Sequence, residues 1–252
     1  MKVSIITVSY NAKNTIGATI ASVLSQRDAE IEYIVVDGGS TDGTRELIAE
    51  QLSKPNTIVS RWISEKDQGM YDALNKGIAM ATGDIVGILN ADDVFEDPYT
   101  VAGIAAAFDE KTDATYADIL FARGNKTSRY YSARRWKPWM HHIGYMPPHP
   151  SVYIRREIFA RLGGYKLGYK ISADFELMVR YFCKARIRTK YLPRCVVQMS
   201  LGGMSTAGWK ANILLNRENV RANRENGYFS CFAMMLPKYA YKILGYIFKK
   251  KR

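Results

Sequence analysis

Short apolar runs and helical patterns alternate along the N-terminal part of the chain. The apolar runs are rich in β-branched residues, which is typical of strands buried on both faces of a parallel sheet. Between them, apolar residues recur at helical spacing, as in Met70, Leu74 and Ile78. The pattern predicts strands over 3–8, 33–37, 57–64 and 84–90, and helices over 15–26, 43–52 and 70–81. This alternation predicts an α/β fold with a mostly parallel, Rossmann-like sheet and helices on both faces.

The pattern is weaker after about residue 121. It predicts helices over 155–162, from Phe175 to Lys184 and over 209–226. The last helix should place Trp209, Ile213 and Val220 on its apolar face. No internal repeat or low-complexity linker interrupts the chain, so we expect one main domain followed by a helical extension.

Charge divides the 252-residue chain unevenly. Residues 1–120 hold 9 Lys/Arg and 19 Asp/Glu, a net of −10, whereas residues 121–252 hold 27 and 5, a net of +22. Such a basic half predicts an anionic partner, either nucleic acid or a membrane surface. The segment Lys238–Arg252 combines six basic residues with tyrosines and a phenylalanine and has no acid. As an amphipathic helix it would bind an anionic membrane surface.

Two further features bear on the compartment. The three cysteines are widely spaced and form no CxxC motif, which is typical of reduced thiols. The chain shows neither a signal peptide nor an apolar run of the roughly 18 residues that a membrane-spanning helix needs. We therefore expect a cytoplasmic protein that is peripheral on the inner face of the cell membrane.

Polar residues follow each of the four predicted strands, where ligands bind in open α/β sheets. The four loops should meet at one edge, and they cover residues 9–11, 37–43, 65–69 and 90–93. Asp92 and Asp93 are adjacent, and such a pair suits Mg²⁺ or Mn²⁺ held together with substrate phosphates, although acids also start helices. The chain lacks both GxGxxG after the first strand and a P-loop, which argues against those two nucleotide-binding types.

Five segments resemble family 2 glycosyltransferases of the GT-A fold in sequence, order and spacing. They are VSIITVSYN (3–11), VDGGSTDG (36–43), SEKDQGMYDALNKG (64–77), GDIVGILNADD (83–93) and the stretch 149–177. The resemblance is closest to bacterial enzymes that build cell-surface polysaccharides. It implies a GT-A domain over 1–205, with a nucleotide-binding part (1–120) and an acceptor and catalytic part (121–205). Residues 206–252 would form the helical extension with its basic tail.

The resemblance also implies roles for the donor side of the site. Tyr10 would stack on the nucleotide base and Asp37 would accept from its ring N–H. Asp67, Asn75 and Lys76 match a segment that lines the nucleotide pocket. Asp92 and Asp93 match the residues that contact ribose and a divalent cation, Mn²⁺ or Mg²⁺. Asn90 replaces the first acid of the family's DXD-type motif, and an amide neutralises no cationic charge.

On the acceptor side, Asp174 matches the family's catalytic base at the start of a late helix. Its other interpretation is a helix-capping acid, and Glu176 is the alternative base. His149 is a further candidate for the metal or the diphosphate, against the alternative of a hydrogen-bonded loop histidine.

Together these roles predict an inverting, metal-dependent glycosyltransferase. It would move a sugar from a nucleotide-diphosphate donor, expected to be a UDP-sugar, to a hydroxyl of a glycan or lipid-linked glycan acceptor. The alternatives are a nucleotidyltransferase and a basic nucleic-acid-binding protein. The first needs a glycine-rich basic loop after the first strand, whereas residues 9–15 hold one lysine and no glycine. The second leaves the acidic loops unexplained, so no nucleic acid partner is expected.

Overall fold

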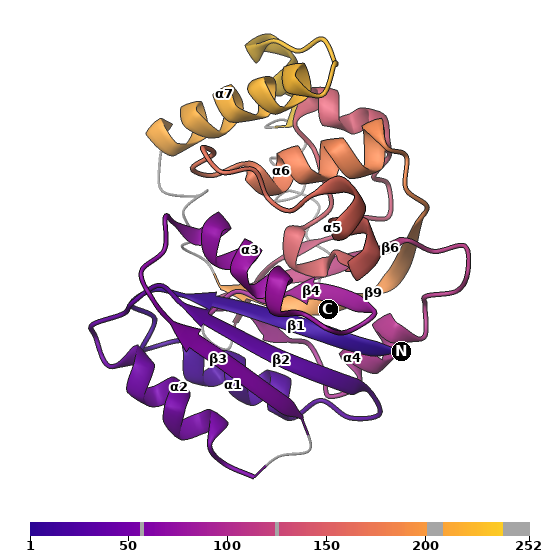
Figure 1. Ribbon diagram of the computed structural model, residues 1–252. Helices are drawn as coiled ribbons and strands as arrows, with labels where there is room; N and C mark the ends of the chain where they lie inside the picture. Colours follow the sequence, from indigo (N-terminus) through magenta and orange to yellow (C-terminus); the bar gives the residue numbers. More distant parts are fainter. Residues whose placement is uncertain (56–57, 124–125, 201–208, 239–252) are drawn as a thin grey trace.

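The computed structural model describes residues 1–55, 58–123, 126–200 and 209–238 (Figure 1). Its centre is a nine-stranded sheet in the order β3-β2-β1-β4-β8-β6-β9-β5, with β7 paired to β6. The strands are β1 (Lys2–Ser9), β2 (Glu30–Asp37), β3 (Val59–Ser64), β4 (Ile85–Ile88), β5 (Val94–Phe95), β6 (Ala114–Arg123), β7 (Lys126–Tyr131), β8 (Tyr153–Arg155) and β9 (Thr189–Ser200).

The sheet has a parallel part and a mixed part. Strands β3, β2, β1 and β4 run parallel, which confirms the parallel sheet expected from their alternation with helices. Strand β8 is antiparallel to both β4 and β6, whereas β9 runs parallel to β6. The register places Ser9 beside Asp37, and Asp37 beside Ser64, so the polar ends of three parallel strands lie in one row.

Helices cover both faces of the sheet, as predicted. On one face lie α1 (Ile16–Leu24), α2 (Thr44–Leu52) and α4 (Thr100–Ala105), and on the other α3 (Met70–Met80), α5 (Arg156–Leu162) and α6 (Ala173–Met178). Because side chains alternate along a strand, neighbouring residues of β1 enter different cores: Ile5 packs with α1 and Ile6 with α3. Each such fully buried aliphatic side chain contributes about 1.5–3 kcal/mol.

The C-terminal part stacks further helices above α3 and α5 (Figure 1). Helix α6 continues into the π-helical turn η3 (Val179–Lys184), and α7 (Trp209–Glu225) packs against α6 at the top of the molecule in Figure 1. The short 3-10 helices η1 (Pro138–Ile143), η2 (His149–Ser151) and η5 (Phe232–Met235) complete this part. Among the described residues, no helix is both long and apolar enough to cross a membrane.

The predicted apolar face of α7 is not the buried one. Trp209 is 69% exposed, and the buried residues of the helix are mainly polar: Asn216, Glu218, Asn219, Ala222 and Asn223. The helix itself was predicted, but its buried side is polar because it packs through hydrogen bonds to neighbouring loops, which apolar periodicity does not report.

Candidate active site

The loops after the parallel strands meet at one edge of the sheet, as expected. The backbone N–H of Gly38 donates to the carbonyl of Ser9 at 2.8 Å, and that of Glu65 to the carbonyl of Asp37 at 3.0 Å. The loop after β4 joins them through Thr19 of α1, whose hydroxyl donates to the carbonyl of Asp93 at 2.8 Å.

Asp37, at the end of β2, connects the loops of this edge through hydrogen bonds. Its carboxylate is fully buried and accepts hydrogen bonds from the hydroxyls of Ser9, Ser40 and Ser64 and from the N–H groups of Gly39 and Ser40. Burial acts to raise its pKa, but these hydrogen bonds outweigh it and lower the pKa. All of these partners belong to the loops at this edge, so Asp37 holds the loops together, and its predicted contact with the nucleotide base stays a prediction.

Tyr10 and Asp67 flank Gly38 and form an open cradle. The Tyr10 ring is 68% exposed. A Cβ placed on Gly38 would meet that ring at 3.4 Å and would overlap the Asp67 carboxylate. Asp67 is half-buried, and its other oxygen accepts from the N–H of Gly69 at 2.8 Å. An exposed ring beside a carboxylate, with no side chain between them, fits the predicted nucleotide site, and these two roles stay predictions.

Asn75 and Lys76 both bond to neighbouring loops. The Asn75 amide donates to the carbonyl of Tyr165 and accepts from its N–H, both at 2.8 Å. Lys76 pairs with Glu65 at 2.7 Å and donates to the carbonyl of Lys66. Each end of the Asn75 amide thus bonds to the backbone of Tyr165, and the predicted contact of Asn75 with the donor stays a prediction.

The acidic pair after β4 has two different environments. Asp93 is 1% exposed and accepts from the Asn90 amide at 2.9 Å and from the N–H of Ser200 at 3.3 Å. Burial, and next the charge of Asp92, raise the pKa of Asp93 to about 7. Asp92 is half-buried, and burial raises its pKa as well. The sequence did not predict that Asn90 would hold Asp93 in place.

This pair fits a divalent cation that arrives together with a diphosphate. Within the described ranges, no basic side chain pairs with either carboxylate, and no group of three metal-ligating side chains gathers anywhere. A proton or a bound cation would neutralise the pair. Magnesium and manganese commonly use one or two carboxylates plus substrate phosphates, which agrees with the half-buried Asp92 as the accessible ligand.

A second cluster connects α3 with the acceptor side. The Nε2 of His149 lies 2.6 Å from the Tyr165 hydroxyl, and the Tyr165 ring stacks on Tyr71 with 5.7 Å between centroids. The Tyr71 hydroxyl donates to the carbonyl of Ile171 at 2.6 Å and lies 3.5 Å from Oδ1 of Asp174. Burial lowers the pKa of His149 to about 4, so the ring is neutral. This contact is the one expected of the hydrogen-bonded loop histidine that the sequence offered as the alternative, and a role of His149 toward the metal or the diphosphate stays a prediction.

Asp174 stands at the start of α6 with one oxygen held and the other open. Oδ1 accepts from the N–H of Phe175 at 2.8 Å, and Oδ2 has no hydrogen-bond partner among the described residues. Burial raises the pKa of Asp174 to about 6, to which the charge of Glu218 adds. Such a carboxylate is ionised at neutral pH and basic enough to accept a proton. Tyr71 lay inside a recognised motif, but its position beside Asp174 depends on the fold.

Glu176, the alternative base, is excluded by its surroundings. Its side chain is fully buried and pairs with Arg180 at 2.9 Å and with Lys166 at 3.1 Å, while the Asn226 amide donates to it at 3.2 Å. Despite burial, the hydrogen bonds and charge of Arg180 lower the pKa of Glu176. It therefore anchors the helix and is not open to a substrate.

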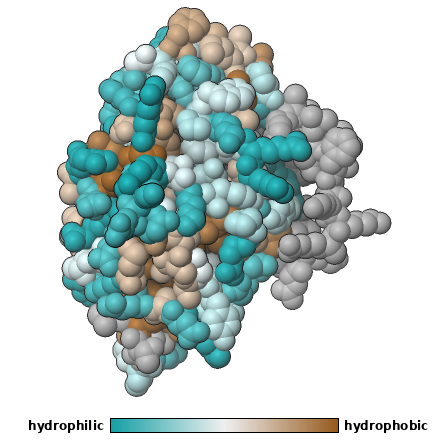
Figure 2. Space-filling view, turned by 90° about the vertical axis from the view of Figure 1, so that its right-hand side faces the viewer, coloured by the Kyte–Doolittle hydropathy of each residue, from teal (hydrophilic) through white to brown (hydrophobic). Residues whose placement is uncertain are grey.

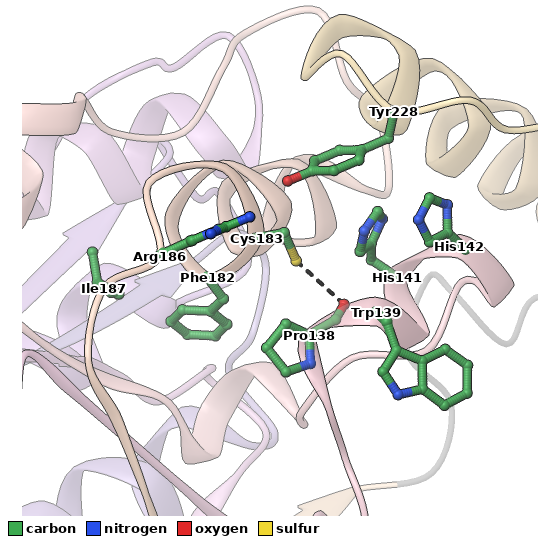
Figure 3. A pocket seen from close by; sticks show the side chains of 9 residues that line it. All are labelled: Pro138, Trp139, His141, His142, Phe182, Cys183, Arg186, Ile187 and Tyr228. Carbon is green, nitrogen blue, oxygen red and sulfur yellow. Dashed lines mark hydrogen bonds between the residues drawn. The ribbon is translucent and has the colours of Figure 1, made fainter.

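A separate cavity of about 430 Å³ lies at the far end of α6 and η3 from Asp174. Figure 3 shows its aromatic and cationic lining, which includes Trp139, His141, His142, Arg186 and Tyr228. Cys183 donates to the carbonyl of Pro138 across it at 3.3 Å. None of the lining residues carries a carboxylate, so this cavity differs in charge from the acidic edge of the sheet.

Fold and site together define a glycosyltransferase of the GT-A class. Residues 4–196 match the description "Glycosyl transferase family 2", and the chain belongs to that family. This confirms the predicted family and enzyme class against the nucleotidyltransferase and nucleic-acid-binding alternatives.

Known proteins agree with this assignment. The chain is 31% identical over 209 residues to a "PGL/p-HBAD biosynthesis glycosyltransferase" of Mycobacterium tuberculosis, covering 80% of this chain and 78% of that protein. Among solved structures, S. aureus TarS matches with a TM-score of 0.66 at 18% identity, over 100% of this chain and 76% of that one. Glucosyl-3-phosphoglycerate synthase from Mycobacterium tuberculosis matches with a TM-score of 0.64 at 16% identity, over 90% and 79%. These likenesses confirm the predicted GT-A fold.

Proposed function

We propose that this glycosyltransferase inverts the configuration of a sugar that it moves from a nucleotide sugar, a UDP-sugar in particular, to a hydroxyl of a glycan or lipid-linked glycan in surface polysaccharide synthesis. The observation that carries the proposal is the open, half-buried carboxylate of Asp174 beside Tyr71. TarS was solved with UDP-GlcNAc, and glucosyl-3-phosphoglycerate synthase with Mn²⁺ and UDP. The name of the mycobacterial relative places it in PGL/p-HBAD biosynthesis.

The chain's own residues account for a single displacement. A sugar hydroxyl is a weak nucleophile at neutral pH, and Oδ2 of Asp174 would take its proton as the new bond to the anomeric carbon forms. The nucleoside diphosphate leaves from the opposite face, and its base would lie in the cradle of Tyr10 and Asp67. One base and one displacement invert the anomeric centre, whereas retention would need a second step.

The leaving diphosphate develops negative charge that must be stabilised where it forms. Mn²⁺ or Mg²⁺, when bound, would supply a Lewis acid there. Asp92 would be the protein ligand, and the buried Asp93 would add negative charge behind it while Asn90 and Ser200 hold its carboxylate in place.

A donor screen tests the proposal. Purified protein is mixed with UDP-glucose, UDP-N-acetylglucosamine or GDP-mannose, with Mn²⁺, with Mg²⁺ or with EDTA, and water serves as acceptor. Release of UDP or GDP that depends on the cation supports the donor class, and NMR of the sugar product reports inversion. Release of inorganic pyrophosphate, or no release from any donor, would refute it.

We also propose that the enzyme works on an anionic membrane surface. The predicted basic tail lies outside the described residues except for Lys238, which is buried. The described part adds an exposed apolar ridge, which comprises Trp139, Phe229, Phe232 and Leu236, each 44–77% exposed. Figure 2 shows hydrophobic side chains at the top of the molecule, where Figure 1 places the segment after α7. Arg186, Arg217 and Arg224 line the two hollows beside this ridge, and such a combination suits anionic lipid.

Flotation with liposomes tests the membrane contact. We compare vesicles of phosphatidylglycerol and phosphatidylcholine with vesicles of phosphatidylcholine alone. Deletion of residues 239–252 and the variant Phe229→Ser should each reduce binding to the anionic vesicles. Trp209→Ser is the matched control, because Trp209 is 69% exposed but stands at the other end of α7. Equal binding of all variants would show that neither the tail nor the ridge is the contact.

A further inference from the structure

Helix α7 forms hydrogen bonds with the loop that precedes α6, the helix that carries Asp174. The helix lies outside residues 4–196, the part that matches the family description. Its Glu218 is 6% exposed and accepts hydrogen bonds from three consecutive backbone N–H groups, those of Lys170, Ile171 and Ser172, at 2.8, 2.9 and 2.9 Å. Bonds from N–H groups to a carboxylate are among the stronger hydrogen bonds in proteins.

These three bonds act directly before Asp174. Ser172 precedes α6, and its carbonyl accepts the first helical bond from the N–H of Glu176 at 3.0 Å. The carbonyl of Ile171 accepts from the hydroxyl of Tyr71 at 2.6 Å. The segment 170–172 is therefore held by α7 from one side and by α3 from the other, which leaves the start of α6 little freedom to move.

We propose that Glu218 is a positioning residue for the sugar transfer, because it fixes segment 170–172 and with it the carboxylate of Asp174. The inference rests on the proposed role of Asp174 as base. It adds that the helix after the matched family region is part of the catalytic apparatus. A displacement of about 1 Å at a reacting group can cost about a hundredfold in rate, so a fixed backbone at this point matters.

Glu218 also acts on Asp174 through its charge. Three groups of the described chain face Asp174: Tyr71 on α3, Tyr165 on the preceding loop and Glu218 on α7. Burial is the main cause that raises the pKa of Asp174, hydrogen bonds from the N–H of Phe175 and from Tyr71 lower it, and the negative charge of Glu218 adds a smaller increase. Loss of that charge should lower the pKa, so the acidic limb of the pH–rate profile should move to lower pH. A purely structural residue would not move this limb.

Glu225 supplies a matched control on the same helix. It holds the same loop further upstream, by pairing with Lys166 at 3.0 Å and accepting from the Tyr169 hydroxyl at 3.0 Å. In the described part of the chain Glu225 makes no hydrogen bond or ion pair with segment 170–172, so Glu225→Gln loosens the loop without releasing the start of α6.

The test measures UDP release from the UDP-sugar that the wild-type enzyme accepts, with Mn²⁺, between pH 4.5 and 8.5. For Glu218→Gln we expect kcat to fall between about tenfold and a hundredfold, with the donor KM within about twofold and the acidic limb at lower pH. Glu225→Gln should keep kcat within about threefold and the limb in place. Glu218→Asp keeps the charge on a shorter side chain, so it should lose kcat while retaining the limb.

Wild-type kcat and an unmoved limb in Glu218→Gln would overturn the inference, as would equal losses in the two glutamine variants. If Glu218→Gln does not fold, Glu218→Asp decides: a lower kcat with an unmoved limb supports the inference, and wild-type kcat refutes it. Failure of the proposed function has another signature, which is full activity of Asp174→Asn or no turnover by the wild-type enzyme.

Discussion

Replacement of Asp174 by asparagine separates a catalytic role from a structural one. The amide oxygen can still accept from the N–H of Phe175, which the carboxylate does at 2.8 Å, but the side chain can no longer take a proton. A general base contributes about 10²–10⁴ in rate, so kcat for donor cleavage should fall by at least about a hundredfold. The donor KM should change little, because Asp174 lies beside Tyr71 and outside the cradle of Tyr10 and Asp67.

The pH dependence of the reaction rate provides a second test of Asp174. With a pKa of about 6, Asp174 is almost fully ionised at pH 8, whereas at pH 5 only about a tenth of it is ionised. The wild-type rate should therefore fall about tenfold between pH 8 and pH 5, and the residual rate of Asp174→Asn should lack this limb. A pH series of UDP release measures both, and Glu157→Gln, an exposed acid in the first turn of α5, is the control.

The same variant should gain stability. A carboxylate whose pKa is raised from 3.8 to about 6 destabilises the folded state once it ionises, so the cost is absent below about pH 4 and complete above pH 6. At about 1.4 kcal/mol per pKa unit, Asp174→Asn should be about 1–3 kcal/mol more stable at pH 8 and equal to wild type near pH 4. Urea denaturation measures this difference. Retained turnover, or lower stability at pH 8, would refute the reasoning.

Three further changes test the frame of the site. Glu32→Gln should lower the free energy of unfolding by about 2 kcal/mol at pH 7 and by less at pH 3, as measured by urea denaturation. Burial acts to raise the pKa of Glu32, but its hydrogen bonds and Arg61 lower the pKa to about 2. The stabilisation by this carboxylate is therefore lost as the pH falls toward that value. Gly38→Ala should raise the donor KM by about tenfold, because the added Cβ overlaps Asp67, and an unchanged KM would exclude this cradle as the nucleotide site. Asp92→Asn should raise the Mn²⁺ concentration for half-maximal activity by about tenfold, as measured in a metal titration. An unchanged Mn²⁺ concentration would show that other residues bind the metal.

The parallel part of the fold could be predicted from the sequence because its signals are local. Strand β2 was predicted over 33–37 and forms Glu30–Asp37, and the helix predicted over 70–81 forms α3, Met70–Met80. Parallel strands buried on both faces leave continuous apolar runs, and their carboxyl ends must lie at one edge. The convergence of the four loops followed from these two facts.

The mixed part of the sheet could not be predicted in the same way. Strand β6 pairs with β9, and the paired residues Ala114 and Thr189 are 75 residues apart in the sequence. Strand β5 has only two residues, and it is defined by its pairing with Val197 and Gln198. Such elements exist because of a distant partner, and no local periodicity marks them.

The sequence predicts which strand end each motif residue follows, but the partner of each side chain depends on the tertiary structure. Asp37 and Asn75 stand at the edge of the sheet where the resemblance placed them, yet their polar atoms hold Ser40 and Tyr165. Both residues act on backbone that carries other groups, as Glu218 does for the loop before Asp174. A site that must hold a base and a donor in fixed relation needs such supports, because loops alone do not hold reacting groups to a fraction of an ångström. Residue type alone does not distinguish a side chain that holds backbone in place from one that binds a ligand, so only the structure could reveal these hydrogen bonds.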